Sequence, residues 1–409
     1  MNCPHCGREL PEGAHYCLHC MKSLQPEADY QPFPSPGRRK RGGVLAAVRR
    51  AAAACTAGIA CAVHPVAVAD TAADSSRASR GTPGQYQEAD TGGYYFTPDG
   101  DAGDPDADAA EFEVEDGMLV RYNGSDATVR VPAGVTAIGQ AAFMGNETVA
   151  EVILPDTLES IYSLAFSGCT ALSRIEIPAS VSRIDSEAFG RCTSLEGHLV
   201  DPESPYYTVE DGILFTADRS ALCDYPAGKE GASYAIPDNV TMVMYWAFQG
   251  NPYLESVSVP AGITELFCTF GYCPSLREIT VDPANPAYKS EDGILYTKDG
   301  STLLCYPASK EGESFTIPEG VTALEGNAFL QAKNLRSVTI PEGVEQLPTF
   351  LFKEVERLEE VHLPSTITLI DSMVLYGALQ NPIFYTPENQ AVTDFCQANG
   401  IPCIVEGTE

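Results

Sequence analysis

The chain has 409 residues and a formal net charge of −31, and its length allows several folded modules. Residues 1–50 are basic, with eight Lys and Arg against four Asp and Glu, so the remainder holds 17 basic and 52 acidic residues. Such an acidic surface opposes a phosphate backbone, which excludes nucleic acid as a partner of that part. It suits an exposed and soluble surface.

The N-terminus carries four closely spaced cysteines in a CxxC-x10-CxxC pattern: Cys3, Cys6, Cys17 and Cys20. Two-residue spacing brings both thiolates of a pair to one ion, and four thiolates complete the tetrahedral shell of a structural zinc. This segment resembles the short bacterial zinc-ribbon family, although Met21 stands where that family usually has Gly. We therefore predict a zinc ribbon over residues 1–24 with zinc as its cofactor. Reduced, unliganded thiols or a redox pair are the alternative.

An uncharged, Ala-rich stretch follows the basic linker 25–43, and we predict one transmembrane helix within residues 44–69. Six basic residues precede the stretch and Asp70 follows it, so the positive-inside rule predicts a cytoplasmic N-terminus. Ala67–Ala69 resembles a cleavage site, so a cleaved export signal is the main alternative and a buried soluble helix is another. Both export interpretations place everything beyond residue 70 outside the cytoplasm. Residues 70–110 are predicted to be a disordered acidic spacer.

Beyond residue 110 the sequence repeats itself around a series of prolines spaced 23 residues apart, among them Pro132, Pro155 and Pro178. In each unit Leu-x-x-Ile-x-Ile alternates like a half-buried strand, and proline ends it. Val-x-x-Ile predicts a second short extended piece, and the Ala-Phe segment predicts a helical turn. One unit cannot bury its apolar residues alone, whereas stacked units can.

These repeats resemble the BspA-like, or treponemal-type, leucine-rich repeats from residue 113 to about residue 385. The resemblance implies a curved solenoid at a bacterial surface, used for adhesion or recognition. The predicted fold class is therefore multi-domain: a leucine-rich-repeat solenoid over 111–385, mainly β with short helical turns, preceded by a small zinc ribbon and one transmembrane helix.

Two longer units interrupt the period. They begin at Asp201 and Asp282, 81 residues apart, and each contains Glu-Asp-Gly-Ile-Leu followed by a predicted hairpin. In the second unit the turn is Asp299–Gly300, a favoured two-residue hairpin signal. A truncated copy before the first full repeat has Asn123–Gly124 in the same role and is expected to cap the exposed core.

Residues 386–409 are predicted to be a C-terminal cap. Pro387 suits a helix start and Gly400 a helix end, with Ala391, Phe395 and Ala398 on one face. Cys396 and Cys403 both lie in this cap, and whether they pair stays open.

No sequence motif for catalysis is present: there is no nucleophile elbow, phosphate loop or metalloprotease signature. His198 and His362 have no carboxylate or Ser partner at a recognised spacing. We therefore predict a non-enzymatic, membrane-anchored recognition protein that binds an extracellular protein or glycan. The alternative is a transmembrane signalling or assembly protein whose cytoplasmic zinc ribbon contacts an intracellular partner. An exported glycan-acting enzyme is a third class.

Side-chain alternation predicts the binding face. If Ile175 and Ile177 enter the core, their neighbours on the strand must point outward. The same register along the repeats gives the predicted ligand residues: Arg174, Glu176, Glu278, Thr280, Ser337, Thr339, Glu360 and His362. The alternative is that binding uses the hairpins near Asp211 and Asp292. The opposite run of a repeat, with Asp185 and Glu187, is expected to tolerate substitution.

Overall fold

The computed structural model describes residues 16–17, 22–23, 111–266 and 269–407, and the chain divides into the units Met1–Thr97 and Pro98–Glu409. In the first unit β1 (Tyr16–Cys17) pairs antiparallel with β2 (Lys22–Ser23). The predicted linkers and membrane segment, residues 25–110, lie outside the described residues. Among the residues that are described, no helix is both long and apolar enough to span a membrane.

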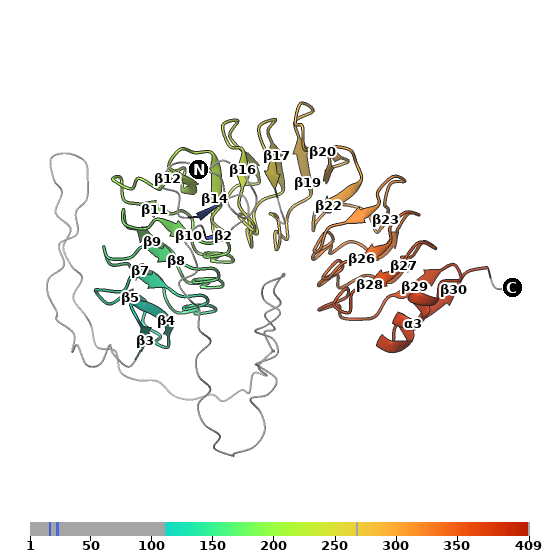
Figure 1. Cartoon of the computed structure of the whole chain (residues 1–409), viewed down its shortest axis with the longest axis horizontal. Coiled ribbons are helices and arrows are strands. Elements are labelled where there is room, and N and C mark those ends of the chain that lie inside the picture. Colours follow the sequence, from blue (N-terminus) through green and yellow to red (C-terminus); the bar gives the residue numbers. More distant parts are fainter. Residues whose placement is uncertain (1–15, 18–21, 24–110, 267–268, 408–409) are drawn as a thin grey trace, which may run out of the picture. The chain divides into compact units, whose positions relative to one another are not determined.

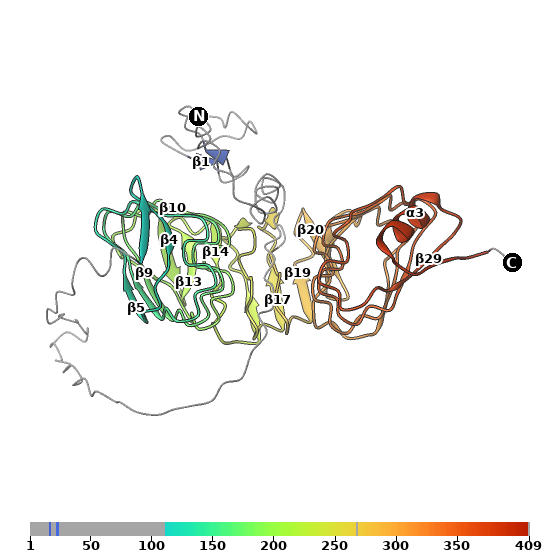
Figure 2. The ribbon, with the colours of Figure 1, turned by 90° about the horizontal axis from the view of Figure 1, so that it is seen from below.

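The second unit is a solenoid with two ladders of strands along its coil (Figures 1 and 2). Ladder A forms three hydrogen-bonded sheets of parallel strands, in the orders β11-β9-β7-β5, β15-β17-β19 and β23-β25-β27-β29-β30. Its strands are β5 (Thr128–Arg130), β7 (Glu151–Ile153), β9 (Arg174–Ile177), β11 (Leu199–Val200), β15 (Ser233–Ala235), β17 (Ser256–Val259), β19 (Glu278–Val281), β23 (Ser314–Thr316), β25 (Ser337–Thr339), β27 (Glu360–His362), β29 (Ile383–Thr386) and β30 (Cys403–Val405).

Ladder B consists of the second, mostly two-residue extended piece of each unit, as the sequence predicted. Its strands are β4 (Met118–Tyr122), β6 (Ala137–Ile138), β8 (Ser160–Ile161), β10 (Arg183–Ile184), β14 (Ala221–Asp224), β16 (Met242–Val243), β18 (Glu265–Leu266), β22 (Thr302–Cys305), β24 (Ala323–Leu324), β26 (Gln346–Leu347) and β28 (Leu369–Ile370). Five further strands form hairpins that extend ladder B: β3 (Phe112–Glu115), β12 (Tyr207–Glu210), β13 (Ile213–Thr216), β20 (Tyr288–Glu291) and β21 (Ile294–Thr297).

The core lies between the two ladders because alternate residues of each strand point inward. In β9 the side chains of Ile175 and Ile177 are fully buried while Arg174 and Glu176 are exposed. The residues at the Phe position of the repeats form a ladder of rings inside the coil. The centroids of Phe143 and Phe166 are 4.9 Å apart, close to the spacing of about 4.8 Å between neighbouring strands.

The Ala-Phe segment of each repeat is a turn and not a helical turn, so that prediction was wrong. The residue two positions before the ring has a positive φ, for example 62° at Leu164 and 60° at Trp246. A residue in this left-handed conformation cannot continue a right-handed helix. Hydrogen bonds between neighbouring turns stabilise the segment instead, such as Phe166 N–H to the carbonyl of Ala188 at 2.8 Å.

Each longer unit adds a hairpin whose tip lies inside Glu-Asp-Gly-Ile. At the tip Asp211 and Gly212 have φ values of 50° and 76°, and Asp292 and Gly293 have 49° and 74°. Glycine is required because a Cβ on Gly293 would lie 2.8 Å from the Cβ of Glu278. Each tip takes the next position along ladder A, as shown by the hydrogen bond from Ile279 N–H to the Gly293 carbonyl at 2.8 Å.

The hairpin predicted to follow Glu-Asp-Gly-Ile-Leu is confirmed, because β21 and β22 pair antiparallel on either side of Asp299–Gly300. The analogous role for Asn123–Gly124 was wrong. In the truncated copy the hairpin turn is Asp116–Gly117 between β3 and β4, and the next strand, β5, belongs to ladder A. This hairpin does cover the first repeat, because the ring of Tyr122 stacks on Phe143 at 5.0 Å.

The C-terminal cap contains the predicted helix, α3 (Gln390–Asn399), with Asn389 as its N-cap and Gly400 in the left-handed C-cap conformation. Its buried face is Val392 and Cys396, so the predicted face is off by one residue. The cap also contains β30, which pairs with β29 and ends ladder A.

Candidate binding surface

The eight predicted ligand residues all lie on the outward side of ladder A. Those on β9 and β19 are exposed, and those on β25 and β27 are half-buried. They do not form one continuous face, because ladder A consists of three sheets interrupted by the two hairpin tips. Only Ser337 with Glu360 and Thr339 with His362 are direct neighbours across paired strands.

A first hollow, of about 360 Å³, lies over the sheet that contains β7 and β9. Arg174 and Glu176 line it, together with Glu151 and Asp156. Arg174 Nε lies 3.0 Å from a carboxylate oxygen of Glu151, an exposed ion pair. Such a pair contributes little stability, about 0–1 kcal/mol, so both groups stay accessible to a partner.

A second hollow, of about 720 Å³, lies over the sheet β15-β17-β19. Its floor is a row of outward residues in register on the three strands: Ser233, Ser256 and Glu278. The hairpin tip at Asp292–Gly293 forms one wall. The strand face and the hairpins were alternative binding sites from the sequence, and here they border the same hollow.

Charged side chains around the second hollow are mostly paired with one another. Arg277 lies 3.5 Å from Glu255 and 3.7 Å from Glu311, and Lys310 Nζ lies 2.8 Å from a carboxylate oxygen of Asp292. Among the described residues, the carboxylate of Glu278 has neither an ion-pair nor a hydrogen-bond partner. It is therefore the charged group of this hollow with the most freedom to accept hydrogen bonds.

At the C-terminal end of ladder A, His362 stacks on Tyr385 with ring centroids 4.6 Å apart and planes 12° apart. Its ring nitrogens lie 3.5 Å from Glu360 and 3.8 Å from Glu406. The imidazole therefore has carboxylate neighbours that its sequence spacing did not reveal. Each ring covers a face of the other, which makes this end a packed edge of the surface.

The repeat pattern matches a known family over more than half of the chain. The family described as BspA type leucine rich repeat region matches in six copies, over residues 122–206, 230–291 and 305–396. The chain belongs to the BspA-type leucine-rich repeat family. This confirms the repeat family that the sequence resembled. No curated protein matches the chain.

Three solved structures are similar to this BspA-type solenoid. They are the pneumococcal vaccine antigen PcpA (22% identity, 69% of this chain and 68% of that chain covered, TM-score 0.43), a leucine rich cell surface protein from Faecalibacterium prausnitzii (27%, 65% and 61%, TM-score 0.41) and a leucine-rich repeat protein from Eubacterium ventriosum (24%, 67% and 69%, TM-score 0.44). This chain thus spans between 61% and 69% of the length of those proteins.

Inside the BspA-type core, the structure brings together His198 and Asp224, which sequence reasoning missed. The two side chains meet with His198 Nε2 2.7 Å from Asp224 Oδ2, and His198 is only 1% exposed. The ring centroid of His198 also lies 4.8 Å from that of Phe189, while its Nδ1 has no hydrogen-bond partner among the described residues. Because this pair is buried, we assign it a structural role.

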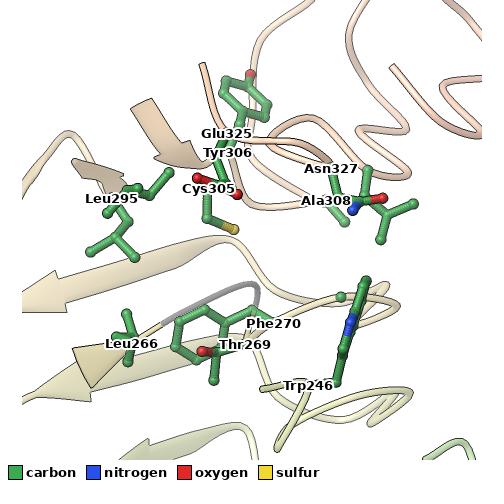
Figure 3. A pocket seen from close by; sticks show the side chains of 13 residues that line it. Trp246, Leu266, Thr269, Phe270, Leu295, Cys305, Tyr306, Ala308, Glu325 and Asn327 are labelled. Carbon is green, nitrogen blue, oxygen red and sulfur yellow. The ribbon is translucent and has the colours of Figure 1, made fainter. Parts of the chain in front are cut away.

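A small cavity lies where the second long unit of the BspA-type array meets the repeats on either side of it (Figure 3). Figure 3 shows Trp246 and Phe270 on one side of the cavity and Cys305 and Glu325 on the other. Its volume is about 40 Å³, which suffices for a water molecule and excludes an organic ligand. Burial raises the pKa of the Glu325 carboxyl above its ordinary value.

The predicted zinc ligands lie almost entirely outside the described residues. Of the four, only the backbone of Cys17 is described, in β1. In the described part of the BspA-type protein, no group of three or more His, Cys, Asp or Glu side chains could hold a metal ion. The zinc ribbon therefore stays a prediction.

Asp185 and Glu187, which were expected to tolerate substitution, take part in the structure. Asp185 accepts two hydrogen bonds from the guanidinium of Arg183, at 2.7 and 3.0 Å. Burial raises the pKa of the Glu187 carboxyl to about 7, although the Lys353 ammonium opposes the shift. Glu159 and Glu345 are better neutral positions, since both are exposed next to ladder B strands.

Proposed function

We propose that this BspA-type protein is a surface recognition or adhesion protein that binds an extracellular protein or glycan through ladder A and catalyses no reaction. The observation that carries the proposal is the pair of open hollows on the outward side of ladder A. Three of the residues selected from strand alternation line them: Arg174, Glu176 and Glu278. Both hollows are open and most of the residues that line them are polar, which favours a broad contact over a deep small-molecule site.

The N-terminal part of the proposal rests on sequence. Residues 44–69 would anchor the protein in the membrane, with the zinc ribbon of residues 1–24 in the cytoplasm and the solenoid outside. Membership of the BspA-type family supports a binding or adhesion role for the solenoid. The acidic composition beyond residue 50 argues against nucleic acid as the partner.

The test compares two sets of substitutions in the full-length protein, purified in a mild detergent and immobilised as bait. The first set, Glu278→Ala, Ser337→Ala and Glu360→Ala together, removes polar groups from ladder A. The second set, Glu159→Ala with Glu345→Ala, removes exposed carboxylates beside ladder B. We expect a partner captured by the wild type to be lost only with the first set, while thermal unfolding stays unchanged in both.

Two outcomes would contradict ladder A as the binding face. Equal capture by both variants would show that these outward residues do not contribute. Loss of capture only after substitution of Asp211, at the first hairpin tip and away from the second hollow, would move the site to the hairpins.

A further inference from the structure

The floor of the second hollow combines two small hydroxyl-bearing side chains, Ser233 and Ser256, with the carboxylate of Glu278. Besides Ser233, Ser256 and Glu278, the next outward row on the same strands is Ala235, Ser258 and Thr280. This row lies beside the lining of the hollow, and in it Thr280 Oγ1 donates to Ser258 Oγ at 3.0 Å. Neighbouring strands lie about 4.8 Å apart, so the outward side chains of the three strands form a regular polar array.

The lining lacks the side chains that anchor most protein partners. Binding energy at protein interfaces concentrates in Trp, Tyr and Arg side chains that fill apolar pockets. Apart from Ala232 and Gly293, every residue that lines this hollow carries a hydroxyl or a charge. Its single guanidinium, Arg277, is already shared between Glu255 and Glu311. A peptide would find little apolar surface to bury here.

The charge of the hollow restricts its ligand further. Four carboxylates and two cationic groups line it, and three of the carboxylates are paired, as described above. Glu278 is left with free acceptor oxygens on the floor. An anionic polymer would be repelled by the excess carboxylate, whereas a cationic side chain would gain only about 0–1 kcal/mol from an exposed pair. A ligand with hydroxyl groups is neither repelled by the carboxylates nor dependent on a weak exposed ion pair. Its hydroxyls donate hydrogen bonds to carboxylates and exchange hydrogen bonds with Ser and Thr.

We infer that the second hollow binds an uncharged, hydroxyl-rich glycan chain, with Glu278 accepting hydrogen bonds from adjacent sugar hydroxyls and Ser233 and Ser256 contacting the same chain. The inference rests on the proposed function and names the partner class of that surface. The volume of about 720 Å³ lies in the range of ligand sites and suits a short stretch of a longer chain.

The experiment measures binding to the full-length protein in detergent by calorimetry with a fixed set of probes. The probes are neutral hexasaccharides of glucose, mannose, galactose and N-acetylglucosamine, the acidic hexamer of galacturonic acid, and hexalysine. Three variants accompany the wild type: Glu278→Ala removes the free acceptor, Ser256→Trp fills the floor, and Glu345→Ala is the matched carboxylate control beside ladder B. Circular dichroism and thermal unfolding establish that each variant is folded.

We expect at least one neutral hexasaccharide to bind, with about tenfold weaker binding in Glu278→Ala, none in Ser256→Trp and unchanged binding in Glu345→Ala. The galacturonic acid hexamer should not bind. The inference is overturned if no neutral hexasaccharide binds, or if Glu278→Ala and Glu345→Ala bind it equally well. If only hexalysine binds and Glu278→Ala abolishes that binding, the glycan inference fails while recognition through ladder A stands. The glycan inference and the proposed function both fail if no probe binds and if the triple variant Glu278→Ala, Ser337→Ala and Glu360→Ala still captures its partner.

Discussion

The structural role of the buried pair His198 and Asp224 can be tested by substitution, because the second long unit has different residues at the equivalent positions. The longer units repeat after 81 residues, so Ile279 and Cys305 occupy the equivalent positions in the second unit. Ile279 is fully buried and Cys305 is half-buried, so the fold accepts less polar side chains at both positions. Substitution of the first pair by small apolar residues therefore has a precedent within the molecule.

The expected magnitudes follow from the contacts of the pair. His198→Ile leaves Asp224 buried without its partner at 2.7 Å, and removal of one member of a buried pair costs about 3–5 kcal/mol. Asp224→Ala leaves both ring nitrogens of His198 unpaired, because Nδ1 has no partner in the described part of the chain, and costs about 1–3 kcal/mol. The double variant removes every unpaired group, and apolar replacement of a buried pair ranges from neutral to about 1–4 kcal/mol more stable.

Thermal unfolding of the four proteins, followed by circular dichroism, measures this cycle. A change of about 1 kcal/mol shifts the melting temperature of a domain of 150–250 residues by roughly 2–4 °C, and somewhat less for the longer unit Pro98–Glu409. Both single variants should therefore melt at a lower temperature than the wild type, His198→Ile by the larger amount. The double variant should melt at or above the wild type, and the two substitutions should be strongly non-additive. A double variant that melts below both single variants would refute the view that the pair is a local polar unit in an otherwise apolar position.

Three further predictions concern the N-terminal region and the turns. Zinc analysis of the full chain under reducing conditions should give one zinc per chain, falling to near zero when Cys3 and Cys6 are replaced by Ser; a wild-type content near zero would contradict the ribbon. In intact cells, an impermeant thiol or lysine label should reach the solenoid but not residues 1–24, and mature protein that starts near Asp70 in the medium would instead indicate a cleaved signal. Glu187→Gln should stabilise the fold above pH 7 and have little effect below pH 4.5. Burial raises the pKa of Glu187 from 4.5 to about 7, so the stability of the wild type falls as the pH rises through that window and the buried carboxyl becomes charged. Melting temperatures at the two ends of the window measure it, and an equal shift at both ends would show that the charge is not responsible.

Periodicity made much of the fold predictable from the sequence. Alternation around Ile175 and Ile177 fixed which side chains enter the core, because a strand has only two faces. The ring ladder followed from the constant spacing of phenylalanines such as Phe143 and Phe166. Stacking of successive repeats brings these equivalent rings into contact. Even the repeat that is one residue short keeps its ring in place, with Phe270 5.2 Å from Phe248.

Features that depend on contacts between units were not predictable. His198 and Asp224 are 26 residues apart, which is no multiple of the repeat length, so no spacing pointed to their contact. Asn251 is fully buried and makes four hydrogen bonds, two from its amide to the carbonyls of Pro226 and Lys229 and two from backbone amides of Tyr253 and Leu254. Asparagine in a loop is common, and its role as a link between turns becomes visible only in three dimensions.

The candidate surface was predictable in direction but not in extent. Outward positions such as Glu278 and Thr280 were identified correctly because alternation holds within each strand. The division of ladder A into three sheets was missed, since it depends on where the tips at Gly212 and Gly293 insert. That insertion depends on close backbone contact, which residue type alone does not specify.

The turns that carry the ring ladder show how the interrupted solenoid is stabilised. At the position two residues after the ring, several turns have glycine, as at Gly168 and Gly250, while Tyr272, Gln331 and Glu354 adopt the same positive φ. For a residue with a side chain this conformation costs about 1–2 kcal/mol.

Those three side chains form contacts that offset the cost. Tyr272 donates to Glu354 at 3.1 Å across 82 residues, Gln331 donates to Glu354 at 2.9 Å, and the Lys353 ammonium lies 5.3 Å from the Tyr272 ring centroid. The apolar core consists of two clusters, one from Leu119 to Leu295 and one from Ile294 to Ile401. Phe270, two residues before Tyr272, belongs to the first cluster, whereas Phe352, two residues before Glu354, belongs to the second. Side chains in a costly backbone conformation therefore connect the repeats on either side of the second long unit, where the apolar core itself changes from one cluster to the next.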